Sequence, residues 1–142
     1  MFADVENLFL TGRGPSLAAV GTGALTIKES DHFAAEGMGS AAFRHGPFEM
    51  IGRHTFLVVF AGADSTRELN ARLVRDVRDH GGVAELVSQD SDSCVFRIPP
   101  HPAAALPIFE ILPVQMITLA LGARARREPG RFTVLSKVTT VE

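Results

Sequence analysis

Cysteine is almost missing from the sequence: the 142 residues contain one, Cys94. A single thiol cannot form an internal disulfide or a thiolate metal site, which excludes a disulfide-stapled secreted scaffold. The five histidines are scattered without the short spacing of metal ligands. We therefore predict no structural metal, and the reducing cytoplasm is the expected compartment.

The chain also lacks a surplus of charge of either sign. Fourteen basic and sixteen acidic residues give a formal net charge of -2. Such a balance produces no field that would collect nucleic acid or an anionic membrane surface. Arginines cluster after a long apolar segment, and a favourable interaction with a helix C-terminus accounts for them. They are Arg124, Arg126, Arg127 and Arg131.

A secretion signal and an unbroken membrane span are likewise missing from the pattern. Residues 1–6 have neither a basic flank nor a long apolar core, so they do not resemble a signal peptide. The stretch 103–123 is apolar but contains a glutamate, Glu110, and two prolines. Lipid satisfies neither a central carboxylate nor the backbone groups that prolines free. We predict a buried, kinked helix here and no membrane partner.

The remaining pattern alternates strands with helices. Short apolar runs predict strands over 7–11, 56–60, 83–87 and 94–98. Helices are predicted over 17–29, 66–80 and 103–123, and a loop or broken helix over 30–44. With 46% hydrophobic residues, the chain fits one domain over 1–142. The alternation indicates an α/β fold, with ligands at the carboxyl ends of a parallel sheet.

The first predicted helix carries a polar stripe that ends in a carboxylate. Thr22, Thr26 and Glu29 share one helix face because they are spaced by four and three residues. A carboxylate facing a strand-end cleft can move a proton between adjacent carbons of an open-chain sugar. A solvated glutamate is the alternative interpretation of Glu29.

Two other side chains could act on a sugar. His45 precedes a Gly-Pro pair and could open a sugar ring by acid–base transfer, or it could cap a helical turn. Lys137, next to Ser136, could bind a sugar hydroxyl or form an imine with a ketose carbonyl, or it could be solvated.

Two glycine- or hydroxyl-containing turns could bind phosphate groups. Ser65 and Thr66 begin a predicted helix and could hold a phosphate, although capping explains them equally and Asp64 would repel the anion. Residues 12–14, Gly-Arg-Gly, open a dinucleotide fingerprint whose third glycine is replaced by Leu17. We therefore predict no nucleotide cofactor, and no cofactor of any other kind.

Several motifs in order resemble a known family. They are GRG at 12–14, GALxxKE at 23–29, AE at 35–36, HGP at 45–47, PIF at 107–109, PVQ at 113–115 and KVTTVE at 137–142. The chain resembles the second sugar-isomerase (SIS) half of the isomerising glutamine:fructose-6-phosphate aminotransferases and related phosphosugar isomerases. This resemblance implies a three-layer α/β/α, flavodoxin-like fold around a five-stranded parallel sheet.

The resemblance also implies roles for individual residues. The residue matching Glu29 transfers the proton, the one matching His45 opens the ring from a neighbouring subunit, and the one matching Lys137 handles the open-chain ketose. A sugar phosphate of the fructose 6-phosphate or glucosamine 6-phosphate type is the implied ligand. A homodimer, or pairing with a first SIS half, is the implied assembly. The expected substrate-binding residues are Thr22, Thr26, Ser65, Thr66 and Ser136.

The chain departs from the family at three positions. Thr22, Thr26 and Ala42 stand where the family usually has a glutamate, a lysine and a glutamate. The family also grips the phosphate through a first SIS half, which these 142 residues do not contain. Two functions therefore remain open: an aldose–ketose isomerase or aminosugar-phosphate isomerase/deaminase, and a non-catalytic phosphosugar-binding or dimerisation module.

Overall fold

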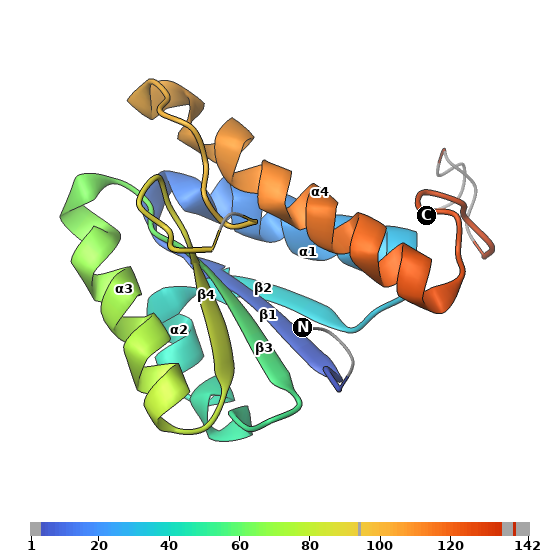
Figure 1. Ribbon diagram of the computed structural model, residues 1–142, viewed down its shortest axis with the longest axis horizontal. Helices are drawn as coiled ribbons and strands as arrows, with labels where there is room; N and C mark the ends of the chain where they lie inside the picture. The colour runs from blue at the N-terminus through green and yellow to red at the C-terminus, as the bar shows by residue number, and fades with distance from the viewer. Residues whose placement is uncertain (1–3, 94, 135–137, 139–142) are drawn as a thin grey trace.

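The computed structural model describes residues 4–93, 95–134 and 138. Their centre is a four-stranded parallel sheet in the order β2-β1-β3-β4, shown in Figure 1. The strands are β1 (Asn7–Gly12), β2 (Ala35–Gly39), β3 (Thr55–Phe60) and β4 (Val83–Val87). The α/β fold class is confirmed.

The sheet differs from the expected one at both edges. The prediction of a strand over 94–98 is wrong for the described residues 95–98. Their β pairing in the described structure is one isolated parallel bridge, between Arg97 and Ser88. At the other edge, β2 lies where we predicted a loop or broken helix. Its sequence, Ala-Glu-Gly-Met-Gly, lacks the β-branched residues that mark strands. The strand forms because β1 pairs with it along its whole length.

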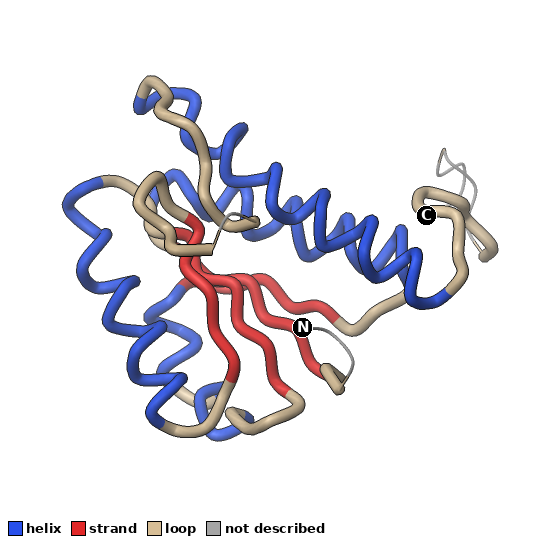
Figure 2. The backbone as a smooth tube through the Cα atoms, in the orientation of Figure 1, coloured by secondary structure: helices blue, strands red, loops and turns tan. Residues whose placement is uncertain are grey.

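Helices cover both faces of the sheet, as Figures 1 and 2 show. α1 (Leu17–Asp31) and α4 (Leu106–Ala125) cover one face, and α2 (Ser40–Arg44) and α3 (Asp64–Asp79) cover the other. β3 is buried at every position because both of its faces are covered. This is the predicted three-layer arrangement.

α1 and α4 run side by side from the carboxyl edge of the sheet to its amino edge. At the carboxyl edge the Ser16 hydroxyl contacts Glu110. At the amino edge the two helices approach closely at Gly122 of α4 and Asp31 of α1. A Cβ placed on Gly122 would lie 3.3 Å from Oδ1 of Asp31. α1 extends two residues beyond the predicted end and closes with His32 in the left-handed region, at φ 52°.

α4 is the predicted long helix, and Pro113 lies inside it. By length and composition, 103–125 is the one stretch of the described residues that could cross a membrane. One face of α4, which includes Glu110, is buried against α1 and the sheet. The opposite face is exposed, so the prediction of a buried helix holds for one side only. The exposed apolar side chains on this face are Ile108, Leu112, Met116 and Leu119.

Candidate functional site

Glu29 lies on the last turn of α1 with its side chain exposed. The expectation that it faces a cleft at the carboxyl ends of the strands is wrong. A helix that follows a parallel strand runs back along the sheet, so the end of α1 returns to the amino edge. Glu29 therefore belongs to the edge where the strands begin.

The C-terminal segment returns to this end of α1. The Gly130 amide donates a hydrogen bond of 2.8 Å to the Ser30 hydroxyl. Beyond that bond, the tail and α1 border an open hollow of about 400 Å³, which we call the Glu29 hollow. It is lined by Lys28, Glu29, His32, Phe132, Thr133 and Val134. The predicted site residues Ser136 and Lys137 lie outside the described residues.

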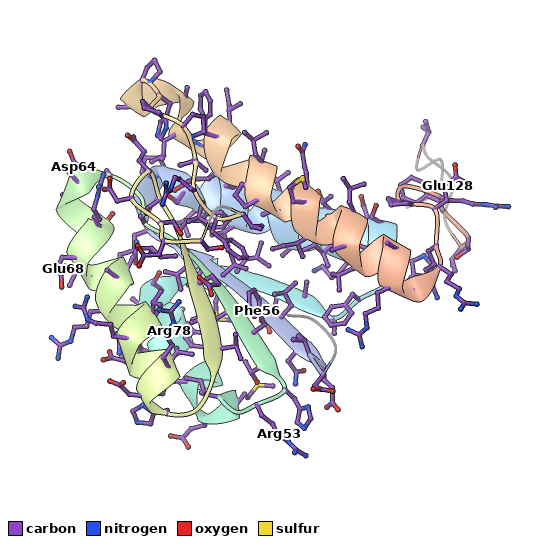
Figure 3. The ribbon with its side chains drawn as sticks, in the orientation of Figure 1. Arg53, Phe56, Asp64, Glu68, Arg78 and Glu128 are labelled. Atoms are coloured by element: carbon purple, nitrogen blue, oxygen red, sulfur yellow. The ribbon has the colours of Figure 1, made fainter. Side chains whose placement is uncertain are left out.

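A second hollow, of about 340 Å³, adjoins the first and shares His32 and Thr133 with it. Three arginines line this second hollow, which we call the arginine hollow. Its full lining is Ser30, His32, Arg126, Arg127, Glu128, Arg131 and Thr133. Figure 3 shows Glu128 at this end of the molecule and Asp64 at the opposite end.

Asp31 is a buried carboxylate at the same end of α1. It is 5% exposed, and neither of its oxygens has a hydrogen-bond partner within the described part of the chain. Burial raises its pKa from 3.8 to about 6, and the charge of Arg127 acts in the opposite direction. Arg127 therefore balances a buried negative charge as well as lining the arginine hollow.

The two threonines of the polar stripe do not line the Glu29 hollow. Thr26 donates its hydroxyl hydrogen to the Thr22 carbonyl at 2.8 Å, one turn earlier on the same helix. The Thr22 side chain is exposed. Both remain predicted contacts for a substrate that extends from Glu29 along α1.

His45 lies on the other side of the sheet from Glu29. It is exposed and closes α2, where its amide donates to the Ala42 carbonyl. α2 packs on the face opposite to α1, with Phe43 in the core between α2 and the sheet. Glu29 and His45 are thus not brought together within one chain.

A further cavity, of about 300 Å³, lies at the carboxyl edge. We call it the carboxyl-edge cavity. Its walls come from the loops after β1, β3 and β4 and from the start of α4. They are formed by Pro15, Ala61, Gly62, Ala63, Asp64, Arg67, Val87, Ser88, Gln89, Ile98, His101, Ala103, Leu106 and Glu110.

Glu110 is the most deeply buried acid of this cavity wall, with no exposed surface. Its Oε1 accepts a hydrogen bond of 2.9 Å from the Ser16 hydroxyl. Burial raises its pKa from 4.5 to about 7, against the hydrogen bonds from Ser16 and the Gly62 backbone and the charge of His101. Sequence reasoning used Glu110 only to argue against a membrane span. The sequence did carry a signal. Glu110 is an acid in an apolar helix, and the apolar residues Leu106 and Val114 lie four positions before and after it, on the same helix face.

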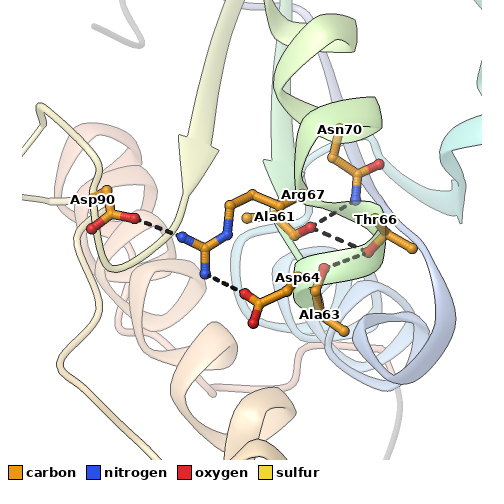
Figure 4. A network of polar contacts seen from close by, with 7 residues as sticks. All are labelled: Ala61, Ala63, Asp64, Thr66, Arg67, Asn70 and Asp90. Carbon is orange, nitrogen blue, oxygen red and sulfur yellow. Dashed lines mark hydrogen bonds and ion pairs between the residues drawn. The ribbon is translucent and has the colours of Figure 1, made fainter.

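An arginine network lies on the rim of the carboxyl-edge cavity, shown in Figure 4. Arg67 donates from Nη1 to Asp90 at 2.6 Å and from Nη2 to Asp64 at 3.0 Å, and its buried Nε has no partner in the described chain. The Thr66 hydroxyl donates to the Ala63 carbonyl at 3.0 Å. Ser65 is exposed, and neither it nor Thr66 lines the cavity.

No group of His, Cys, Asp or Glu within residues 4–93, 95–134 and 138 is arranged to hold a metal ion.

Comparison with known families gives a match to the SIS domain model over residues 1–123. Curated relatives are isomerizing glutamine–fructose-6-phosphate aminotransferases. The one from Chlorobaculum tepidum is 28% identical over 146 residues, covering 98% of this chain and 24% of the relative. The one from Acidithiobacillus ferridurans is 31% identical over 150 residues, covering 99% and 24%. The chain thus spans about a quarter of these relatives.

Solved structures share the fold. Glucosamine-6-phosphate deaminase from Thermotoga maritima superposes with a TM-score of 0.82 at 17% identity, over 96% of this chain and 41% of the other. The C-terminal domain of glucosamine-fructose-6-phosphate aminotransferase from Francisella tularensis gives 0.74 at 24% identity, over 86% and 36%.

Proposed function

Because the chain belongs to the SIS domain family, we propose that it is a single sugar-phosphate-binding SIS domain of the second-half type, acting in the cytoplasm. Its activity is that of an aldose–ketose sugar-phosphate isomerase or an aminosugar-phosphate isomerase/deaminase. The observation that carries this proposal is the return of the tail to Glu29. It leaves an exposed carboxylate beside an open hollow of about 400 Å³, within the volume range of small-ligand sites.

The arginine hollow supports a phosphorylated substrate. Guanidinium groups bind phosphate oxygens in pairs, and Arg126, Arg127 and Arg131 line one hollow together with His32. Since this hollow adjoins the one at Glu29, a sugar phosphate can place its phosphate among the arginines and its carbonyl carbons near the carboxylate. The chain thereby supplies an anion contact of its own.

Glu29 would act as the proton-transferring base. It can take the proton from the carbon next to the carbonyl and return that proton to the former carbonyl carbon. A second proton moves from the hydroxyl oxygen on the neighbouring carbon to the former carbonyl oxygen. No atom is gained or lost, so the ketose and the aldose are isomers. Lys137 follows the described tail in the sequence and is the proposed partner for the open-chain carbonyl.

We propose that the active unit pairs this chain with a second SIS unit, either another copy or a first half. Ile108, Leu112, Met116 and Leu119 on α4 are 42–67% exposed. Such a stripe on one helix is typical of an interaction surface. Because one chain does not bring His45 to Glu29, a His45 that opens the sugar ring there must come from another unit.

The experiment supplies fructose 6-phosphate, glucose 6-phosphate and glucosamine 6-phosphate to the purified chain, alone and mixed with a first SIS half from a relative. We expect interconversion or deamination in at least one condition, and loss of turnover in Glu29→Gln. Glu68→Gln is the matched control, because Glu68 is an exposed acid on α3 whose ion pair with Arg75 contributes little.

The non-catalytic binding or dimerisation module is the alternative, supported by the engaged Thr26 hydroxyl and the separation of Glu29 from His45. It predicts that sugar phosphates raise the melting temperature of both the wild type and Glu29→Gln without turnover. That pattern in every condition would replace the enzymatic proposal with the binding one.

A further inference from the structure

Asp31 lies under the tail, where the ends of α1 and α4 adjoin (Figure 1). The three segments meet at Gly122 of α4. A Cβ placed on Gly122 would lie 3.3 Å from Oδ1 of Asp31 and 3.4 Å from the Arg127 carbonyl oxygen. The Arg127 amide also donates a hydrogen bond of 2.8 Å to the Gly122 carbonyl. The backbone of Arg127 is thereby fixed beside the Asp31 carboxyl group.

The Asp31 carboxyl group is short of polar contacts. Asp31 is 5% exposed, and both of its carboxyl oxygens are buried without a hydrogen-bond partner among the described residues. Burial opposes the ionisation of such a group, and a nearby positive charge favours it. Here burial has the larger effect on the pKa of Asp31, and the charge of Arg127 acts against it. The ionised form of Asp31 therefore depends on the Arg127 guanidinium.

Arg127 also belongs to the arginine hollow. Its side chain is exposed and lines this hollow together with Arg126 and Arg131. An anion in the hollow would neutralise part of the positive charge on which Asp31 depends, and an ionised Asp31 would repel that anion. Anion binding and the ionisation of Asp31 therefore oppose each other.

Other charged side chains lie around this end of α1, on the same three segments. They are Lys28, Glu29 and His32 on α1, Arg126 at the end of α4, and Glu128 and Arg131 on the tail. Histidine is the residue type in this group that gains a proton near neutral pH. His32 lines the arginine hollow, so its protonation also attracts an anion. An experiment on Asp31 must therefore remove the contribution of His32.

We propose that Asp31 is a positioning residue of the arginine hollow, which acts through Arg127 so that a phosphate or sulfate dianion bound there makes Asp31 take up a proton from solvent. This inference rests on the proposed role of the hollow as the phosphate site, and it adds the regulation of that site by pH. Since the pKa of Asp31 is about 6, the affinity for the anion is highest below pH 6 and falls as the pH rises through this value.

The test is a nuclear magnetic resonance titration of the whole chain with sulfate at pH 5 and pH 8, at constant ionic strength. Sulfate keeps both of its negative charges over this range, whereas a phosphate group gains a proton. The chain carries His32→Asn, because asparagine tolerates the left-handed conformation that His32 adopts. Sulfate should shift the backbone amides of Arg127 and Arg131. It should bind about threefold more tightly at pH 5, which corresponds to a rise of about half a unit in the pKa of Asp31 on binding.

Asp31→Asn in the same chain should bind sulfate equally at both pH values, because asparagine is uncharged at each of them. Glu128→Gln is the matched control. Glu128 is an exposed acid that lines the same hollow. Its replacement should strengthen sulfate binding at both pH values and keep the ratio between them.

A second measurement keeps the test decisive if Asp31→Asn folds poorly. The Asp31 carboxyl carbon of the His32→Asn chain, followed against pH, should titrate at a higher pH with sulfate than without it. If sulfate shifts the amides of the arginine hollow but leaves this titration in place, or if Asp31→Asn keeps the pH dependence, the role of Asp31 is wrong and the phosphate site stands. If sulfate shifts no amide of the hollow at either pH, both the phosphate site and this inference are overturned.

Discussion

The hydroxyl of Ser16 donates a hydrogen bond of 2.9 Å to Oε1 of Glu110, across 94 residues of sequence. Ser16 closes the turn after β1, and Glu110 lies in the second turn of α4. Both side chains are fully buried. The bond ties the start of α1 to the start of α4. The stability of this edge therefore depends on whether Glu110 carries a proton.

The first prediction concerns the pH dependence of stability. A folded-state pKa of about 7 against an ordinary 4.5 means that the folded chain holds the Glu110 proton more tightly than the unfolded chain. The contribution of this group is full below pH 4.5 and is lost as the pH rises to 7. The loss is on the order of 3 kcal/mol, at 1.36 kcal/mol for each pH unit between the two pKa values.

Glu110→Gln mimics the protonated acid, so it should remove this loss. The variant should match the wild type near pH 4 and exceed its unfolding free energy by about 3 kcal/mol at pH 8, as measured by urea denaturation. Asp31, whose raised pKa is about 6, titrates in both proteins and cancels in the comparison. Parallel pH profiles for the two proteins would contradict the assignment.

The second prediction separates the hydrogen bond from the charge. Ser16→Ala removes the donor to Oε1 and should cost about 1 kcal/mol when Glu110 is protonated and about 2–3 kcal/mol when it is ionised. Ser40→Ala is the matched control, because Ser40 is equally buried but its hydroxyl has no partner in the described chain. Denaturation of both variants at pH 5 and pH 8 checks the difference. Equal losses from the two substitutions would show that the Ser16–Glu110 bond contributes nothing.

Much of the fold could be predicted from local sequence because its strands carry strong signals. β3 is a continuous hydrophobic run that both helical layers bury, and β1 is nearly as apolar. β2 carried no such signal. It is an edge strand that contains Gly37, where a Cβ would lie 2.7 Å from the Val20 carbonyl oxygen. Gly37 permits this close approach of β2 to α1, a tertiary requirement that hydrophobic periodicity does not show.

The sites were harder to predict because they depend on which edge of the sheet a residue reaches. Motif order pointed to Glu29 and His45 as candidates, but spacing along the chain did not show that α1 and α2 cover opposite faces. Glu110 was recognisable as an unusual acid in an apolar helix. Its hydrogen bond to Ser16, 94 residues away, could not be predicted from the local sequence. The tail contact of Gly130 with Ser30 joins residues 100 positions apart and has no local signature.

The third prediction concerns the attachment of the tail. Ser30→Ala removes the acceptor of the Gly130 amide, 2.8 Å away, so the segment that lines the Glu29 hollow should open more often. Limited trypsin digestion should then cut after Arg127 and Arg131 several-fold faster than in the wild type. Thr26→Ala is the control, since the Thr26 hydroxyl donates its hydrogen bond to the Thr22 carbonyl within α1. If both variants are cut at the wild-type rate, the bond does not hold the tail in place.

The fourth prediction tests how closely α1 and α4 must approach. A Cβ on Gly23 would lie 2.8 Å from Cδ2 of Leu10 and 3.2 Å from the methyl groups of Val114, whereas a Cβ on Gly21 would meet nothing within 4 Å. Both glycines are inside α1, so alanine gains similar helix propensity at each, up to about 1 kcal/mol. At Gly23 the overpacking should cost about 1–3 kcal/mol and outweigh this gain.

Gly21→Ala should therefore raise the unfolding free energy and Gly23→Ala should lower it. Gly23→Ala should also push α4 outward, stretch the Ser16–Glu110 bond and raise the pKa of Glu110 further, which Gly21→Ala should not do. Urea denaturation measures the first difference, and carboxyl carbon chemical shifts followed against pH measure the second. If the two alanine variants have the same stability and the same Glu110 titration, α4 tolerates displacement from α1. The packing of α1 against α4 then does not determine the shape of the carboxyl-edge cavity.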